Sequence, residues 1–436
     1  MNQKGSVKSF IAGIIGTTIE WYDFGLFGFL APVIAELFFP AQEKWVSLLQ
    51  TFTIFAIGYF LRPLGGAFFG SVADRFGRVI ALRSTILLTS LPSLLIACLP
   101  TYASIGILST VLLIVLRLLQ GLSVGGEFAG SMVYLNEIAA PRFRVLLSGL
   151  SNNASNIGVL LGVGLSSLLS FLMPHDLFLS IGWRIPFFVG GILGIAGYQL
   201  RKIFIESYEF LLLQKEKKLH QKPLKVLFKK YKPLLILGTL MCWMGACGIY
   251  ILTVYLSTYL SAIKHYTLNE ALSLQSILLI LTLFFVPAAS LLSNYFNKVT
   301  LLKIAVCGNM LYAFWGFAYL PSNNIYLAGA SLLPLIIFIS IEQGIMPTVL
   351  SEIFPTAVRY SAVSISYNLS YAYIGGAAPM YVTWLIDKFQ NPCVPAYCIM
   401  LASLMTGLAL ALLFPTRQKL CMLQKIQNVG FSQDNI

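Results

Sequence analysis

Three carboxylates lie within long apolar runs, where they could carry protons across a membrane. Glu20 and Asp23 are three positions apart in the run 10–39, so they share one face of a helix. Glu127 lies in the run 105–134 and follows the small residues of SVGG. Ionisable groups are costly inside a membrane and usually serve a function there. Because none of the three histidines lies in an apolar run, we expect Asp23, Glu127 and Glu20 to include the group that couples to protons, with structural ion pairing as the alternative.

A second set of residues has the chemistry to bind a small organic ion. An arginine fork can hold a carboxylate through two hydrogen bonds, and aromatic faces attract a cation. Tyr367 and Tyr371 are four positions apart and share a helix face beside Asn368. Tyrosines of membrane proteins also serve as packing or interface residues, which is the alternative for them. The predicted substrate-binding residues are Arg62, Arg117, Arg184, Tyr250, Tyr367, Asn368 and Tyr371.

The stretch 70–83, GSVADRFGRVIALR, concentrates charge between two apolar runs. Charges at this density are expensive in hydrocarbon, so the stretch is predicted to form a short loop on a membrane face. Gly70 and Gly77 allow close approach of the backbone. The charged residues Asp74, Arg75 and Arg78 are candidates for a latch between conformations, and anchoring the topology is a role that the same charges fill in any case.

Composition identifies an integral membrane protein. The chain has 436 residues, of which 58% are hydrophobic and only 10% are charged, whereas soluble domains carry about 25% charged residues. The apolar runs are too long for the strands of a membrane barrel. The net charge of +13 falls in short segments between apolar runs, which indicates membrane topology and excludes a nucleic-acid partner.

The apolar runs predict an all-α protein of twelve transmembrane helices in two pseudo-symmetric six-helix halves. Of 29 Lys and Arg residues, 23 fall on the side that holds both termini and four on the other, so both termini are predicted to be cytoplasmic. The spans are predicted at 10–39, 46–69, 80–99, 105–134, 145–172, 184–201, 233–262, 270–293, 301–320, 326–350, 361–386 and 395–414.

The polar segment 202–232 is predicted to be a cytoplasmic linker between an N-terminal half, 1–201, and a C-terminal half, 233–414. A repeat supports this division, because NEIAAPRFR (136–144) and SEIFPTAVR (351–359) each place Glu and Arg seven residues apart. The second copy of the charged loop, SNYFNKVT (293–300), lacks the Asp and the arginines. Residues 415–436 are predicted to be a cytoplasmic tail without a coiled coil.

Several segments resemble the metabolite:proton symporter branch of the major facilitator superfamily, which includes proline/betaine transporters. They are IEWYDFGLFGFLAP (19–32), FLRPLGGAFFGSVADRFGR (60–78), RLLQGLSVGGEFAGS (117–131), GWRIPFF (182–188) and FPTAVRYSAVSISYN (354–368). The resemblance implies that Asp74 contacts the start of the eleventh span near Tyr360–Ser361. It also implies that Arg78 reaches Glu137, which completes the predicted latch.

Together these observations predict a proton-coupled symporter that imports a small zwitterionic osmolyte such as proline or betaine by alternating access. A symporter of a mono- or dicarboxylate such as 2-oxoglutarate, citrate or shikimate is the alternative. A channel would need a repeated filter, and an enzyme would need a nucleophile–base pair or a metal site within the spans; neither pattern is present. We expect no enzymatic activity, no cofactor and no metal, and we expect a monomer in the inner membrane of a bacterium.

Overall fold

A computed structural model describes residues 3–39, 58–321 and 324–414, and all regular secondary structure in these ranges is helical. The elements of the first part of the chain are α1 (Gln3–Phe29), α2 (Ala31–Phe38), α4 (Arg62–Phe76), α5 (Arg78–Cys98), α6 (Tyr102–Ile105), α7 (Ile107–Ile138), η1 (Pro141–Phe143), α8 (Arg144–Leu172), α9 (His175–Leu177), η2 (Phe178–Gly182), α10 (Arg184–Leu200) and η3 (Arg201–Ile203).

The connecting segment contains two short helices, α11 (Tyr208–Lys215) and α12 (Pro223–Lys230). The elements that follow are α13 (Lys232–Met241), α14 (Trp243–Tyr250), η4 (Ile251–Tyr255), α15 (Leu256–Ala262), α16 (Leu268–Leu292), α17 (Lys298–Ala318), α18 (Ile325–Ile353), α19 (Arg359–Leu369), η5 (Ser370–Gly376), α20 (Ala378–Phe389) and α21 (Val394–Leu413).

The helices match the predicted spans closely. Within the described ranges, nine helices are long and apolar enough to cross a membrane, and the number is ten if the bent pair of α1 and α2 is counted as one span. Much of the predicted span 46–69 lies outside the described residues. The predicted span 361–386 is divided into α19, η5 and α20, so no single helix in it meets the length and apolarity of a span. The described helices confirm the predicted all-α membrane fold and are consistent with twelve transmembrane helices in two six-helix halves.

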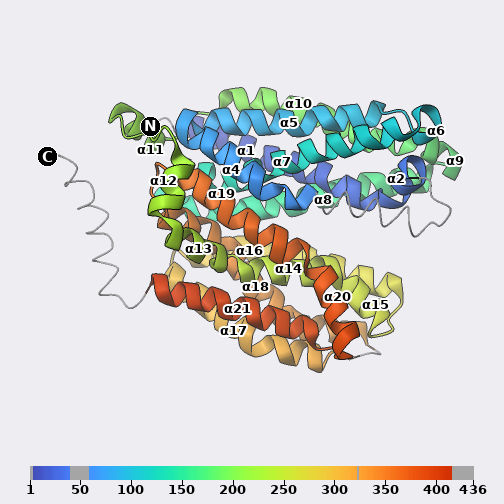
Figure 1. The fold of residues 1–436 in the computed structure, drawn as a ribbon. Coiled ribbons are helices and arrows are strands. Elements are labelled where there is room, and N and C mark those ends of the chain that lie inside the picture. The colour runs from blue at the N-terminus through green and yellow to red at the C-terminus, as the bar shows by residue number, and fades with distance from the viewer. Residues whose placement is uncertain (1–2, 40–57, 322–323, 415–436) are drawn as a thin grey trace.

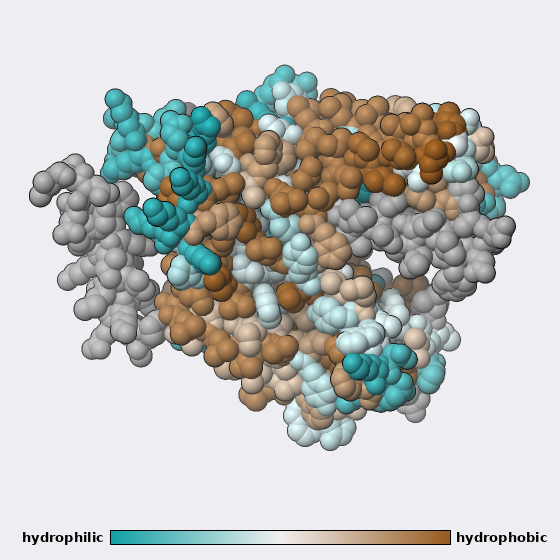
Figure 2. Space-filling model, in the orientation of Figure 1, coloured by the Kyte–Doolittle hydropathy of each residue, from teal (hydrophilic) through white to brown (hydrophobic). Residues whose placement is uncertain are grey.

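The two sets of helices form two bundles side by side, with α11 and α12 at one end (Figure 1). The face of the molecule in Figure 2 is largely apolar between its two ends, and hydrophilic residues gather over α11 and α12 at one of them. An apolar belt between polar ends is expected when the long axis of the bundles crosses a bilayer. The predicted boundaries of the halves, the linker and the tail stay predictions.

Small residues bring α4 and α7 into close contact. A Cβ atom added to Gly125 of α7 would collide with the backbone oxygen of Arg62, and one added to Gly65 of α4 would collide with the backbone of Leu122. Helices in a membrane associate through this kind of close packing, because the hydrophobic effect does not drive their association there. The packing fixes Arg62 beside α7 in the interior of the bundle.

The predicted loop 70–83 is much shorter than expected. Helix α4 continues through Phe76 and α5 begins at Arg78, so Gly77 alone forms the turn with φ +120°. A residue with a side chain rarely adopts that conformation. Gly70 and Asp74 therefore lie in the last turns of α4, and the charged residues occupy helix ends.

Two wide helical turns interrupt the second half at the level of its aromatic residues. Residues 251–255 and 370–376 form π-helical turns, η4 and η5. Tyr250 immediately precedes η4, and Tyr371 lies within η5. Such turns are common at functional sites because they shift the side chains of one helix face out of register. Both turns here place tyrosines toward the interior.

Candidate functional site

Six aromatic residues form a continuous series between the two halves, which we call the central aromatic cluster. Trp21 of α1 packs edge-on against Phe128 of α7, and Phe128 lies 5.1 Å from Tyr367 of α19 between ring centroids. Tyr367 stacks on Tyr371 with centroids 3.9 Å apart. The series continues from Tyr371 to Tyr250 at 6.4 Å and from Tyr250 to Tyr59 at 6.0 Å. The predicted residues Tyr250, Tyr367 and Tyr371 are thus brought together.

Arg62 closes this series, because its guanidinium carbon lies 5.4 Å from the ring centroids of both Trp21 and Tyr59. Its Nε atom donates a hydrogen bond to Asn368 Oδ1 at 3.1 Å. Both terminal nitrogens are buried and have no hydrogen-bond partner among the described residues. The guanidinium therefore presents two donors beside aromatic faces and the nearby Tyr250 hydroxyl, which is a geometry suited to a carboxylate.

Asn368 holds this arrangement in place. Its Nδ2 atom donates to Gly125 O at 2.6 Å and to Ser364 O at 2.8 Å, while its Oδ1 atom accepts from Arg62. The side chain joins α19 of the second half to α4 and α7 of the first. Both polar atoms of the Asn368 amide already form hydrogen bonds within the protein. Asn368 therefore orients Arg62 and has little hydrogen-bonding capacity left for a ligand.

Glu127 is held by a basic residue that sequence reasoning did not select. Arg201 forms a two-pronged ion pair with the Glu127 carboxylate, and Thr85 donates to the same carboxylate. Both members of the pair are almost completely buried. Arg201 lies at the end of an apolar run, where the sequence favours a side chain that points to the cytoplasm. Its inward direction follows from the end of α10 at Leu200 and the tight turn η3.

Asp23 and Arg117 lie in a second polar group, further along the contact between α5 and α7. Arg117 donates to Gln120 at 3.1 Å, and Gln120 donates to Ser93 at 2.8 Å. The Asp23 carboxylate is fully buried, with Ser93 and Arg117 as its polar neighbours and Gly190 packed against it. This carboxylate has a guanidinium within electrostatic range without a direct ion pair among the described residues.

Glu20 lies between the two groups. Its nearest charged neighbours are Glu127, Arg201, Arg62 and Asp23. Neither carboxylate oxygen has a hydrogen-bond partner among the described residues. The three predicted proton-coupling residues therefore lie in one connected region of the first half, and among the described residues Glu127 alone of the three has an ion-paired counterion.

Arg184 lies apart from the other predicted binding residues. It donates to the backbone oxygens of Ala97 and Leu99 at 2.8 and 2.7 Å, and its guanidinium carbon lies 4.5 Å from the centroid of Trp183. These contacts satisfy the last carbonyls of α5. The structure gives Arg184 a capping role at a helix end, and we do not propose it as a ligand for the substrate.

Residues of the predicted latch meet at the end of the molecule where α11 lies. Asp74 Oδ1 accepts from the backbone nitrogen of Tyr360 at 3.2 Å, and Oδ2 accepts from that of Ser361 at 2.9 Å. Arg78 donates to both oxygens of Glu137 at 3.1 and 3.2 Å. The two contacts implied by the family resemblance are therefore confirmed, while their role as a latch stays a prediction.

Two further residues join this network, which we call the end cluster (Asp74, Arg78, Glu137, Arg359 and Glu209). Arg359 of α19 donates to Glu137 at 2.9 Å and also contacts Glu209 of α11. Burial lowers the pKa of Arg359, but the Glu137 and Glu209 carboxylates outweigh this effect and raise it. Arg78 also donates to the backbone oxygen of Thr356 at 2.7 Å. The end cluster thus joins the first half, the connecting segment and the second half.

The repeat in the sequence could have indicated Arg359, because it is the second-half equivalent of Arg144. Both arginines pair with Glu209, a residue that the sequence distinguishes only by its charge. The decayed second loop also retains part of the pattern, since Lys298 pairs with Glu352 at 2.5 Å as Arg78 pairs with Glu137. Arg75, by contrast, is exposed and lies over Phe76, with 4.7 Å between its guanidinium carbon and the ring centroid.

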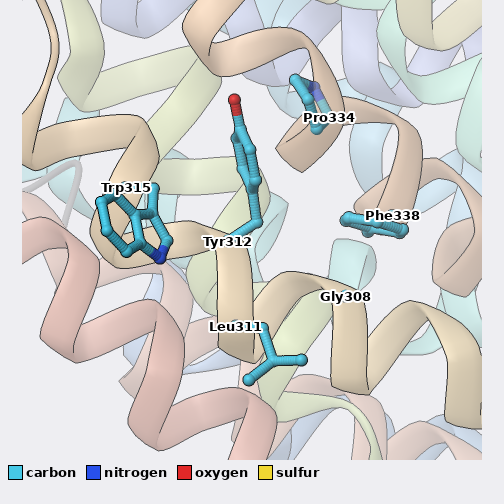
Figure 3. A pocket seen from close by; sticks show the side chains of 6 residues that line it. All are labelled: Gly308, Leu311, Tyr312, Trp315, Pro334 and Phe338. Atoms are coloured by element: carbon cyan, nitrogen blue, oxygen red, sulfur yellow. The ribbon is translucent and has the colours of Figure 1, made fainter.

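A shallow groove of about 350 Å³ lies outside these sites, between α17 and α18 (Figure 3). Its lining is apolar apart from the Tyr312 hydroxyl, and Leu311 and Trp315 are exposed beside it. This is the chemistry expected of a surface that contacts lipid. Within the described ranges, no group of three or more His, Cys, Asp or Glu residues could hold a metal ion.

Solved structures with the same architecture include that of the proton:xylose symporter XylE bound to 6-bromo-6-deoxy-D-glucose. The TM-score is 0.77 at 19% sequence identity, and the match covers 95% of this chain and 96% of the other. The inward-open conformation of XylE from E. coli gives a TM-score of 0.56 at 18% identity, covering 93% and 95% of the two chains. At these identities the likeness shows the fold alone.

Curated relatives are more similar in sequence. The glycine betaine/proline/ectoine/pipecolic acid transporter OusA of Dickeya dadantii (strain 3937) is 33% identical, covering 92% of this chain and 82% of its own length. The proline/betaine transporter of Escherichia coli (strain K12) is 32% identical, covering 92% of this chain and 83% of its own length. The inner membrane metabolite transport protein YhjE of the same strain is 34% identical, covering 94% and 95%.

The family model described as "Sugar (and other) transporter" matches residues 8–227 and again residues 213–427. Together the two matches cover nearly the whole chain. With this match, the curated relatives and the fold in agreement, the chain belongs to the sugar (and other) transporter family of the major facilitator superfamily and is a membrane transporter.

Proposed function

We propose that this transporter is a proton-coupled symporter that imports a small zwitterionic osmolyte such as proline or betaine by alternating access. The observation that carries the proposal is the buried Arg62 guanidinium, whose two terminal nitrogens lie beside the rings of Trp21 and Tyr59 and are not engaged by any carboxylate in the part of the chain that the structure describes. The names of the relatives OusA and the proline/betaine transporter of Escherichia coli support this substrate class.

The central aromatic cluster suits the other end of such a substrate. A quaternary ammonium has no N–H group and a pyrrolidinium has only two, so hydrogen bonds contribute little to binding either cation. Aromatic faces and a nearby anion therefore stabilise it most. Tyr250, Tyr367 and Tyr371 supply faces from the second half, while Arg62 belongs to the first. A substrate held between Arg62 and these tyrosines would contact both halves, as alternating access requires.

Proton coupling belongs with the carboxylates of the first half, and the geometry ranks them. Glu127 is ion-paired with Arg201 and hydrogen-bonded to Thr85, so loss of its charge would leave a buried guanidinium without a partner. Asp23 has no direct ion pair among the described residues but lies near Arg117 and Ser93. Asp23 is therefore our first candidate for the proton site, with Glu20 beside it.

A mono- or dicarboxylate such as 2-oxoglutarate is the second candidate substrate. Arg117 favours it, because a second buried guanidinium lies in the first half within electrostatic range of Tyr59. Arg117 already donates to Gln120 at 3.1 Å, however, and so offers less free capacity than Arg62. For this reason we place the zwitterion first.

Uptake by purified protein in proteoliposomes tests the proposal. Radiolabelled glycine betaine, proline and 2-oxoglutarate are offered with and without an inwardly directed proton gradient. We expect betaine or proline to accumulate above equilibrium only with the gradient. Accumulation of 2-oxoglutarate alone would favour the second candidate, and gradient-independent equilibration of all three compounds would contradict proton symport.

Location follows from the same proposal. We place the protein in the inner membrane of a bacterium as a monomer, with both termini cytoplasmic, because 23 of 29 basic residues lie on the side of the termini. The end cluster then faces the cytoplasm. Labelling of single cysteines introduced at Lys218 and Lys388 from each side of the membrane checks this orientation.

A further inference from the structure

A buried carboxylate of the second half, Glu342, belongs neither to the end cluster nor to the predicted proton-coupling residues. Glu342 lies in α18 and is only 1% exposed. It forms no ion pair within the described ranges, and its Oε2 atom has no hydrogen-bond partner there. Glu127 and Glu137, by contrast, both form ion pairs with arginines.

Such a carboxylate is expensive unless a cation meets it. An ionised group at this depth pays a large desolvation cost, which only a nearby positive charge or several hydrogen bonds can offset. The titratable neighbours of Glu342 are Cys242 and Tyr371, and neither supplies a positive charge. The missing partner must therefore be a proton, or a cation that the protein does not itself provide.

Space for the carboxylate is made by a glycine. A Cβ atom added to Gly245 of α14 would collide with the Glu342 carboxyl group. The next glycine of α14, Gly248, packs in the same way against Ile339 of α18. This packing holds the Glu342 carboxyl group against α14, the helix that ends in Tyr250 of the central aromatic cluster.

Tyr371 connects Glu342 to the cluster from its other side. Tyr371 lies within electrostatic range of Glu342, stacks on Tyr367 and packs against Tyr250. Tyr250 leads through Tyr59 to Arg62. The cluster thus has a guanidinium from the first half at one end and a lone carboxylate from the second half beside its tyrosines.

We propose that Glu342 is a specificity-determining residue that receives the positively charged ammonium group of the substrate, while Arg62 receives the carboxylate. This inference rests on the proposed function and adds the residue that distinguishes a zwitterion from a simple carboxylate. A substrate with both charges neutralises both buried groups. An anion of the same shape leaves Glu342 without its cation.

A pair of ligands of equal shape tests this role. Glycine betaine and 3,3-dimethylbutanoate differ in having a quaternary nitrogen or a quaternary carbon, so only betaine carries the positive charge. Binding of each compound to the purified full-length protein in lipid nanodiscs is measured by calorimetry, for the wild type and for Glu342→Gln. The exposed Glu36→Gln is the matched control for the substitution itself.

We expect wild type and Glu36→Gln to prefer betaine, and Glu342→Gln to lose betaine affinity by at least about tenfold. Affinity of Glu342→Gln for 3,3-dimethylbutanoate should not fall below that of the wild type, since that ligand has no positive charge for Glu342 to meet. Glu342→Asp, which retains the charge, should recover part of the preference. These results together would support the assignment.

Other results would overturn it. Equal loss of both ligands in Glu342→Gln would mean that the residue shapes the site without recognising charge, and unchanged affinity for both would remove it from the site. Failure of the proposed function would give a different result, because the wild-type protein itself would then bind neither betaine nor proline. Thermal unfolding of each variant separates loss of binding from loss of folding.

Discussion

At the scale of single residues, each buried charge is distinguished by the partner that it has or lacks. Glu127 has Arg201, and Glu137 has Arg78 and Arg359. Glu20, Glu342 and the terminal nitrogens of Arg62 have no hydrogen-bond partner for their buried polar atoms among the described residues. The paired groups are suited to stabilising the structure, and the unpaired groups are suited to binding a ligand or a proton reversibly.

Arg62 gives the first prediction at this scale. Replacing it with Lys keeps the charge but removes the planar fork and the hydrogen bond from Nε to Asn368. We expect Arg62→Lys to weaken the apparent affinity for betaine by about tenfold or more, which corresponds to about 1.4 kcal/mol. Concentration-dependent uptake in proteoliposomes measures the change, with the exposed Arg75→Lys as the matched control. An unchanged apparent affinity in a folded variant would remove Arg62 from the site.

Asp23 and Glu127 give the second prediction, because replacing each carboxylate should have a different effect on transport and stability. Asp23→Asn should abolish uphill accumulation and retain exchange of labelled for unlabelled substrate, as expected of a lost proton site. Glu127→Gln leaves Arg201 buried without its partner, at a cost of about 3–5 kcal/mol, so stability should fall along with both activities.

A double variant provides the control for this comparison. Glu127→Gln with Arg201→Met removes both charges and should recover much of the lost thermal stability, because no unpaired charge remains. If Glu127→Gln alone stays as stable as wild type and loses only uphill accumulation, Glu127 is the proton carrier and our ranking is wrong.

At the scale of elements, most of the fold could be predicted from hydropathy, but the interruptions could not. Nine predicted spans correspond to single continuous helices or series of helices within the described residues. The turns η4 and η5 left no signal, because a change in hydrogen-bond register does not change the apolarity of the sequence. The sequence predicts a longer loop at 70–83 than the structure has, since buried partners for Asp74 and Arg78 allow these charges to remain in helices.

The candidate site was predictable in its residue types and not in its pairings. A charge in an apolar run is visible in the sequence, which is why Asp23, Arg62 and Glu127 could be selected. Arg201 could not, because its inward direction depends on where α10 ends. Arg184 was selected for its charge, and its contacts with the end of α5 depend on the packing of two helices.

Close helix contacts give the third prediction, which compares two glycines of similar crowding. A Cβ atom on Gly70 would lie 2.6 Å from the Ser361 Cα atom, in the contact of α4 with α19 between the halves. A Cβ atom on Gly125 would collide with α4 within one half. Overpacking costs about 1–3 kcal/mol in either place. The structural change that relieves the steric clash differs between the two places.

Gly70→Ala should remain folded and open the end that carries the end cluster, because the two halves can separate there. Gly125→Ala should instead lower the thermal unfolding temperature, because α4 and α7 cannot separate without disrupting their half. Unfolding in detergent measures the stability, and labelling of a cysteine introduced at Ser361 measures the opening. Equal losses of stability in both variants would contradict this distinction.

At the scale of the whole molecule, the end cluster closes one end of the interface between the halves. Asp74 of α4 meets the start of α19, Arg78 of α5 meets Thr356, and Arg359 reaches Glu137 of α7. The central aromatic cluster lies further along the same pair of helices, α4 and α19. A conformational change that opened this end would therefore have to break the end cluster while leaving each half intact.

Asp74 gives the last prediction, which concerns the balance between conformations. Its two oxygens accept from two backbone nitrogens at the start of α19, where the helix dipole favours an anion by about 0.3–1 kcal/mol and by up to about 2 kcal/mol when partly buried. Asn removes the charge and replaces one acceptor with a donor. Asp74→Asn should therefore shift the population toward molecules open at this end, by as much as about tenfold.

The shift is measured by labelling single cysteines placed near the α11-side ends of α7, α8, α18 and α19, in a background without the seven native cysteines. Arg75→Gln changes the charge of an exposed neighbour and should leave the labelling as it is. Labelling should increase in Asp74→Asn while unfolding within each half stays unchanged, because the lost contacts lie between the halves. If transport is lost with unchanged labelling, Asp74 serves folding or insertion and does not act as a latch.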